Sequence, residues 1–165
     1  MAEQTPIDAH DIAAGLKKAY ENLPLLEAAH VAASKPTAPG YEPSSFNHKY
    51  ATINGYKYHY VEEGNLDGTP IILIHGFPDM WYGWRYQIRH LAKQGYRVIA
   101  IDNLGTGETD HPRCENGDYS IYSAKNLAAN IVGLMDELKI QKAVIVGHDW
   151  GALIAGKIGL DFPDR

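Results

Sequence analysis

The stretch from Ala143 to Ala152 constrains the fold more than any other part of the sequence. It reads Ala-Val-Ile-Val-Gly-His-Asp-Trp-Gly-Ala: a short β-branched run, then two glycines separated by three residues, and then a helical pattern. The two glycines let the backbone turn tightly, because they carry no Cβ that could clash. The stretch therefore predicts a strand, a sharp turn and a helix, with Asp149 raised above the carboxyl end of a sheet.

An aspartate at the tip of such a turn favours a particular chemistry. A carboxyl group has an ordinary pKa of about 3.9, so it is ionised at neutral pH and needs no base to activate it. It can attack a strained or activated sp3 carbon and form an alkyl ester, which water then cleaves through an oxyanion. Asp149 therefore points to epoxide opening or halide displacement rather than peptide cleavage. The alternative is an ordinary βα turn, in which the helix dipole favours an Asp at the N-terminus.

The rest of the chain predicts an α/β protein with a mainly parallel sheet and helices on both faces. Phe46 to Ile53 and Tyr56 to Glu62 are predicted strands, joined by a strong Asn54-Gly55 hairpin signal. Alternation in the second strand predicts one covered and one wet face, with His59 exposed. Further strands are expected over 71–74, 97–101 and 142–146, and helices over 81–94, 124–138 and 150–161, the second capped by Ser120 or Ser123.

The N-terminal 45 residues form a predicted extension to the domain at 46–165. Residues 6–34 show helical spacing interrupted by Pro24, and residues 35–45 have the composition of a linker. The net charge of −5 and the absence of a basic block exclude nucleic acid as an expected partner. Cys114 is the only cysteine, so no internal disulfide can form. No apolar run approaches a membrane span, and no signal pattern is evident, so a cytoplasmic protein is expected.

Three motifs in chain order resemble those of the α/β-hydrolase-fold epoxide hydrolases. They are His75-Gly76-Phe77-Pro78 with the following residues 81–87, Asp102 with the glycine-bearing loop after it, and Gly147-His148-Asp149-Trp150-Gly151. The resemblance covers residues 50–165. It implies the N-terminal half of an α/β-hydrolase fold, with an incomplete sheet and no lid. It also implies a small apolar epoxide as substrate, with no cofactor and no metal.

The resemblance assigns roles to the matched positions. Asp149 corresponds to the nucleophile, and the backbone N–H groups of Phe77 and Trp150 would form the oxyanion hole. The substrate pocket would be lined by the side chains of Phe77, Pro78 and Trp150, and in this family the peptide before Pro78 is often cis. The remaining motif positions have structural roles: His75, Gly76, Asp102, Gly147, His148 and Gly151.

Two related classes of dehalogenase share an aspartate nucleophile. Haloalkane dehalogenases usually carry Asn at the position of Phe77, and fluoroacetate-type dehalogenases tend to carry Arg at the position of Trp150. Epoxide opening therefore leads among the three, with a haloalkane or haloacetate dehalogenase as the alternative.

The positions of the histidines predict that this chain does not complete a catalytic cycle. The chain order in this fold is nucleophile, acid, histidine, yet all eight histidines precede Asp149. The histidine base and the lid tyrosines of the family have no match here, so we expect an inactive chain that ends soon after the elbow. The strand before the elbow would lie at an exposed sheet edge and promote self-association. A non-catalytic interaction partner is the competing interpretation.

Overall fold

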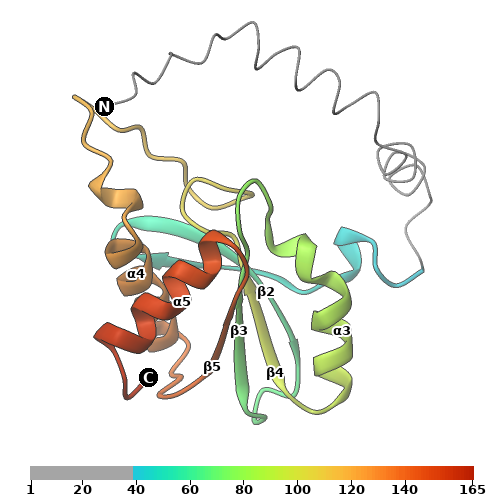
Figure 1. Cartoon of the computed structure of the whole chain (residues 1–165). Coiled ribbons are helices and arrows are strands. Elements are labelled where there is room, and N and C mark those ends of the chain that lie inside the picture. The colour runs from blue at the N-terminus through green and yellow to red at the C-terminus, as the bar shows by residue number, and fades with distance from the viewer. Residues whose placement is uncertain (1–38) are drawn as a thin grey trace, which may run out of the picture. The chain divides into compact units, whose positions relative to one another are not determined.

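The computed structural model describes residues 39–165, so the predicted helical extension at 6–34 lies outside the described part of the chain. Its strands form one sheet in the order β1-β2-β4-β3-β5 (Figure 1). The strand bounds are β1 His48–Ile53, β2 Tyr56–Gly64, β3 Pro70–Ile74, β4 Arg97–Ile101 and β5 Val144–Gly147. Strand β3 pairs in parallel with β4 and β5, whereas β2 pairs antiparallel with β1 and β4. The sheet is therefore an antiparallel hairpin joined to a parallel half.

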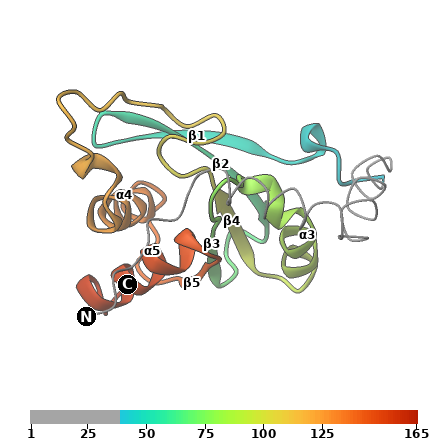
Figure 2. The same cartoon turned by 45° about the horizontal axis from the view of Figure 1, so that its top comes forward.

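Helices cover both faces of this sheet (Figures 1 and 2). Their bounds are α3 Arg85–Lys93, α4 Ala124–Glu137 and α5 Trp150–Asp161. Helix α3 packs over a buried cluster that includes Ile88, Val98 and Leu73, while α4 and α5 enclose the cluster of Ile72, Ile131 and Ile154 on the other face. The predicted α/β arrangement is thus confirmed. No helix of residues 39–165 has the length and hydropathy that a bilayer crossing requires.

Local signals explain where several elements begin and end. Asn54 and Gly55 both have positive φ angles, as a two-residue hairpin turn requires. Ser123 caps α4 by accepting a hydrogen bond from the backbone N–H of Asn126 at 3.3 Å. Gly95 follows α3 with φ +89°, so the predicted helix end is confirmed. These turns are set by the residues within them.

Residues 39–45, within the predicted linker, contact the α/β body. Pro43–Ser45 form a 3-10 turn, the hydroxyl of Tyr82 donates to the carbonyl of Tyr41 at 2.9 Å, and Arg89 donates to the carbonyl of Ser45 at 2.7 Å. This part of the linker is therefore held against α3 and the turn before it.

Two sequence-based expectations need correction. The helix expected over 81–94 begins as a 3-10 turn, Trp81–Trp84, and becomes α-helical only from Arg85. His59 is fully buried rather than exposed. The alternation in β2 did not reveal this burial, because both faces of β2 are covered along most of its length.

Candidate active site

The turn between β5 and α5 carries Asp149. Its φ of +54° lies in the left-handed region, which non-glycine residues seldom adopt. A Cβ on Gly147 would overlap the carbonyl of Gly151, and a Cβ on Gly151 would overlap the carbonyl of Ile74 in β3. Backbone therefore packs directly against backbone, and this packing holds Asp149 at the carboxyl ends of adjacent parallel strands.

The carboxylate of Asp149 is exposed to solvent and faces two backbone amides. Its Oδ1 accepts a hydrogen bond from the N–H of Phe77 at 3.1 Å. Hydrogen bonds from the N–H groups of Trp150 and Phe77 lower the pKa of Asp149, and the nearby His148 acts in the same direction. The carboxylate is therefore ionised at neutral pH, accessible, and hydrogen-bonded to a donor from the loop after β3.

The loop after β3 delivers one of these donors. A Cβ on Gly76 would lie 2.5 Å from the Cβ of Asp149 and 2.9 Å from the carbonyl oxygen of His148, so only glycine fits this close approach. The next peptide bond, Phe77–Pro78, is cis. The elbow and this loop meet so closely that the N–H of Phe77 reaches the carboxylate of Asp149.

The two histidines beside the motifs differ in environment. His75 is buried, and its Nε2 accepts from the N–H of Asn103 at 3.1 Å. Because a backbone N–H can only donate, the ring hydrogen lies on Nδ1, which donates to the carbonyl of Gly76 at 2.7 Å. Both nitrogens of His75 are therefore engaged in holding loops together. The His148 side chain is exposed, and its ring makes no hydrogen bond within residues 39–165.

Asp102 follows β4 and is completely buried. Its Oδ1 accepts from the N–H of Trp81 at 2.9 Å, and its Oδ2 accepts from the N–H of Glu108 at 3.0 Å and from Nδ1 of His59 at 2.7 Å. Burial by itself raises the pKa of Asp102, but the hydrogen bonds from His59, Trp81 and Glu108 outweigh it and leave the pKa lowered. Asp102 therefore joins the hairpin to the loops that follow β3 and β4.

His59 is the residue of this region that sequence reasoning missed. Its partner Asp102 lies 43 positions further along the chain. A strand histidine offers no local signal for such a contact, since the same alternation suits an exposed residue.

A mostly apolar hollow of about 390 Å³ lies beside the elbow. Gly76, Phe77 and Trp150 line it together with apolar side chains from α4, α5 and the loop after β4: Leu104, Leu127, Leu153 and Ile154. The rings of Phe77 and Trp150 are 75% and 62% exposed, so they form its rim. Pro78, which the resemblance places in the pocket, is exposed and lies outside the lining of this hollow. The hollow suits an apolar ligand next to the carboxylate.

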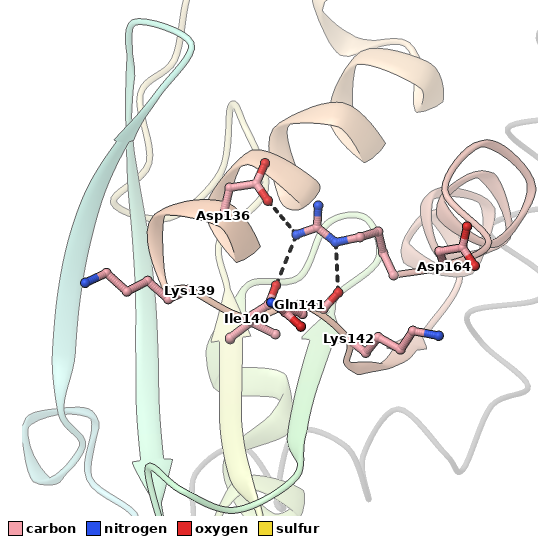
Figure 3. A pocket seen from close by; sticks show the side chains of 7 residues that line it. Asp136, Lys139, Ile140, Gln141, Lys142 and Asp164 are labelled. Carbon is pink, nitrogen blue, oxygen red and sulfur yellow. Dashed lines mark hydrogen bonds and ion pairs between the residues drawn. The ribbon is translucent and has the colours of Figure 1, made fainter.

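A second hollow, of about 550 Å³, lies near the start of β5, whereas the elbow follows its end (Figure 3). Arg165 lines this hollow. Its guanidinium group donates to Asp136 at 2.6 Å and to the carbonyls of Ile140 and Gln141 at 3.0 and 2.9 Å. Its donors are thus directed at the loop between α4 and β5. Arg165 therefore links the segment after α5 to the end of α4, and this hollow is separate from the elbow.

Comparison with known proteins shows which family the chain belongs to. The model of the alpha/beta hydrolase fold matches residues 69–165. Epoxide hydrolase 3 of Siraitia grosvenorii is 43% identical over 118 residues, covering 72% of this chain and 35% of that protein. Human epoxide hydrolase 4 is 40% identical over 125 residues, covering 74% of this chain and 33% of that protein.

Solved structures agree with these relatives. An epoxide hydrolase from Vigna radiata superposes with a TM-score of 0.68 at 35% identity, covering 75% of this chain and 37% of that one. Epoxide hydrolase A of Mycobacterium thermoresistibile gives a TM-score of 0.68 at 36% identity, covering 73% and 36%.

The chain belongs to the alpha/beta hydrolase fold family, and its relatives within that family are epoxide hydrolases. The predicted fold and the predicted enzyme family are therefore confirmed. The chain spans about a third of the length of the curated relatives it matches.

Proposed function

We propose that this chain carries the nucleophile and the oxyanion-stabilising amides of an epoxide hydrolase. The observation that supports this proposal most directly is the hydrogen bond from the N–H of Phe77 to Oδ1 of Asp149 at 3.1 Å. The N–H of Trp150, the residue that follows Asp149 at the start of α5, also lowers the pKa of this carboxyl group. Such donors stabilise negative charge on a carboxyl oxygen when water attacks an ester carbonyl.

The reaction starts with attack on an epoxide carbon. The free oxygen of Asp149 forms a bond to that carbon, the ring C–O bond breaks, and the resulting alkoxide takes a proton from solvent. Oδ1 becomes the carbonyl oxygen of the alkyl ester and keeps its hydrogen bond to Phe77. Water then adds to the carbonyl carbon and gives up a proton to solvent. The oxyanion collapses, the C–O bond to the alkoxide breaks, the alkoxide takes up a proton to complete the diol, and the carboxylate of Asp149 is regenerated.

The second step lacks a suitable base among the described histidines. His75 uses both ring nitrogens, and His59 lies buried against Asp102. His148 is exposed beside Asp149, but its ring has no hydrogen-bond partner within residues 39–165 that would orient it as a base. Every histidine also precedes Asp149 in the chain. We therefore expect the 165-residue chain to form the ester slowly and to release diol far more slowly still.

Intact-mass and peptide mass spectrometry test the proposal with styrene oxide as the probe. We expect a mass increase of one probe molecule on the peptide that contains Asp149. Asp149→Asn should abolish the adduct, whereas Asp161→Asn, which removes a carboxylate at the far end of α5, should leave it unchanged. Equal labelling of all three proteins would contradict the proposal, as would sustained diol release by the wild-type chain.

A haloalkane probe distinguishes the dehalogenase alternative. Phe77 occupies the position at which haloalkane dehalogenases carry a halide-binding Asn, so we expect slower alkylation by 1,2-dibromoethane than by styrene oxide. Faster reaction with the haloalkane would favour the dehalogenase. Failure of both probes would favour the non-catalytic interaction partner.

The sheet edge formed by strand β5 is relevant to whether the chain is monomeric in solution. Strand β5 has no neighbour on its outer side within residues 39–165, and Val144, Leu153 and Leu160 are 50%, 59% and 78% exposed. We propose that the chain self-associates through this edge. Light scattering coupled to gel filtration should show mass rising with concentration. Val144→Lys should reduce that rise, and Tyr119→Lys, at an exposed position elsewhere, should not.

A further inference from the structure

Two imidazoles and a carboxylate converge on the hairpin, outside the candidate active site. His48 lies on β1, His59 on β2, and Glu108 in the loop after β4. One potential ligand atom from each lies within 4.8 Å of the other two. In the β1–β2 register His59 pairs with Tyr50, so His48 is its diagonal neighbour on the same sheet face.

The outer nitrogen of each imidazole already has an acceptor. Nδ1 of His59 donates to the carboxylate of Asp102 at 2.7 Å, and Nε2 of His48 donates to the carbonyl of Pro43 at 2.9 Å. Carboxylates and backbone carbonyls in these positions are the usual partners of metal-bound histidines, because they fix the ring orientation and leave the other nitrogen free to coordinate.

The inner nitrogens of the two rings face each other. Nδ1 of His48 and Nε2 of His59 are 2.8 Å apart. With both outer positions donating, a hydrogen bond between the inner nitrogens requires one further hydrogen, so that one ring carries two N–H groups. A metal ion would replace this single hydrogen and accept a lone pair from each ring.

We infer that His48, His59 and Glu108 form a site for a divalent transition metal ion of the Zn²⁺ class. Two imidazoles and one carboxylate are donors that suit Zn²⁺, Co²⁺ and Ni²⁺ better than Mg²⁺ or Ca²⁺. The carboxylates of Glu108 and Asp102 offset the charge of the ion, and a fourth position is left for water.

The local geometry permits the adjustment that coordination needs. With Zn–N bonds of about 2.0–2.1 Å, tetrahedral coordination places two ligand nitrogens about 3.3 Å apart. The rings must therefore separate slightly, which His48 can accommodate because it is only partly buried and lies on the edge strand β1. Glu108 is exposed and provides a route for the ion, and the hydroxyl of Tyr50 donates to its carboxylate.

Metal titration of the purified full-length chain tests this inference. After removal of metals with EDTA, we expect calorimetry to show one Zn²⁺ per chain, and Co²⁺ to develop the visible absorption of a tetrahedral complex. Glu108→Gln should weaken the binding at least tenfold, and His48→Gln should abolish it. His90→Asn, an exposed histidine on α3, serves as the matched control and should bind like the wild type.

The variants also separate metal binding from folding. Glu108→Gln changes an exposed side chain, so its melting temperature without metal should stay within a few degrees of the wild type. If His48→Gln does not fold, Glu108→Gln decides the outcome. The inference is overturned if Glu108→Gln binds Zn²⁺ as tightly as the wild type, or if wild-type binding is weaker than millimolar. None of these measurements depends on epoxide chemistry.

Discussion

Asp102 and Asp149 are two aspartates that follow strands of the same sheet, and they differ in their exposure to solvent. Each follows a parallel strand, β4 or β5, and each has its pKa lowered by hydrogen bonds from N–H donors. Asp102 is fully buried and has donors on both oxygens, whereas Asp149 is exposed and keeps room for an incoming carbon. Burial and the number of partners, rather than the carboxyl group itself, separate Asp102 from the nucleophile that we propose at Asp149.

The largest expected effect comes from Asp102→Asn. Its Oδ1 and Oδ2 each accept from a donor, so an Asn NH₂ in either orientation would face another donor inside the protein. Breaking a buried pair in this way costs about 3–5 kcal/mol. Urea unfolding followed by circular dichroism should show this loss. A midpoint equal to that of the wild type would erase the contrast between the two aspartates.

Gly76→Ala should affect the exposed aspartate without touching the buried one. The added Cβ would lie 2.5 Å from the Cβ of Asp149, so the loop after β3 must move. Such overpacking costs about 1–3 kcal/mol. We expect alkylation of Asp149 to slow by about tenfold or more, since about 1.4 kcal/mol in the barrier is a factor of ten. An unchanged labelling rate would show that the added Cβ does not displace Asp149 from its reactive position.

Measuring stability at low pH separates the contributions of the two aspartates. The folded pKa of each aspartate lies below its unfolded value of about 3.9, so the stabilisation is present above that pH and is lost as the pH falls through the folded pKa. One group contributes at most about 1.4 kcal/mol per pH unit to this slope. Asp149→Asn should retain most of the loss of stability below pH 4, because the buried Asp102 remains. A flat profile in that variant would contradict this expectation.

The smallest effect on stability is expected for Asp149→Asn itself. Asn has the same shape as Asp, so the turn at φ +54° and ψ −121° is equally strained in both, and the side chain stays in water. The free energy of unfolding should hardly change, as for most surface substitutions. Urea midpoints of the two Asp→Asn variants, measured side by side, should therefore differ widely.

Local signals made the elbow and the hairpin predictable from the sequence. Helix α5 spans the predicted residues 150–161, and β5 is displaced by one or two residues from the predicted strand at 142–146. The Asn54-Gly55 turn was equally clear, because the turn residues themselves impose the conformation. Where a few adjacent residues determine the backbone, the sequence is sufficient.

Contacts between distant segments were not predictable in the same way. The burial of His59 depends on Asp102, and the 3-10 turn at Trp81 is held by a hydrogen bond to Asp102 from 21 positions away. The acceptor role of Nε2 in His75 depends on the amide of Asn103, which lies 28 positions further on. Periodicity within one element contains no information about such partners.

The junction at Asp102 has a consequence for how the chain assembles. It collects donors from residues that precede it by 43 and 21 positions, and contacts between such remote segments tend to form slowly. The β1–β2 hairpin contributes no hydrogen bond to Asp149. It does contribute His59 to Asp102, and Asp102 also accepts from the N–H of Trp81, at the end of the loop that begins with Phe77. In a nascent chain the junction would thus be complete only after β2 had docked against the loop that follows β4.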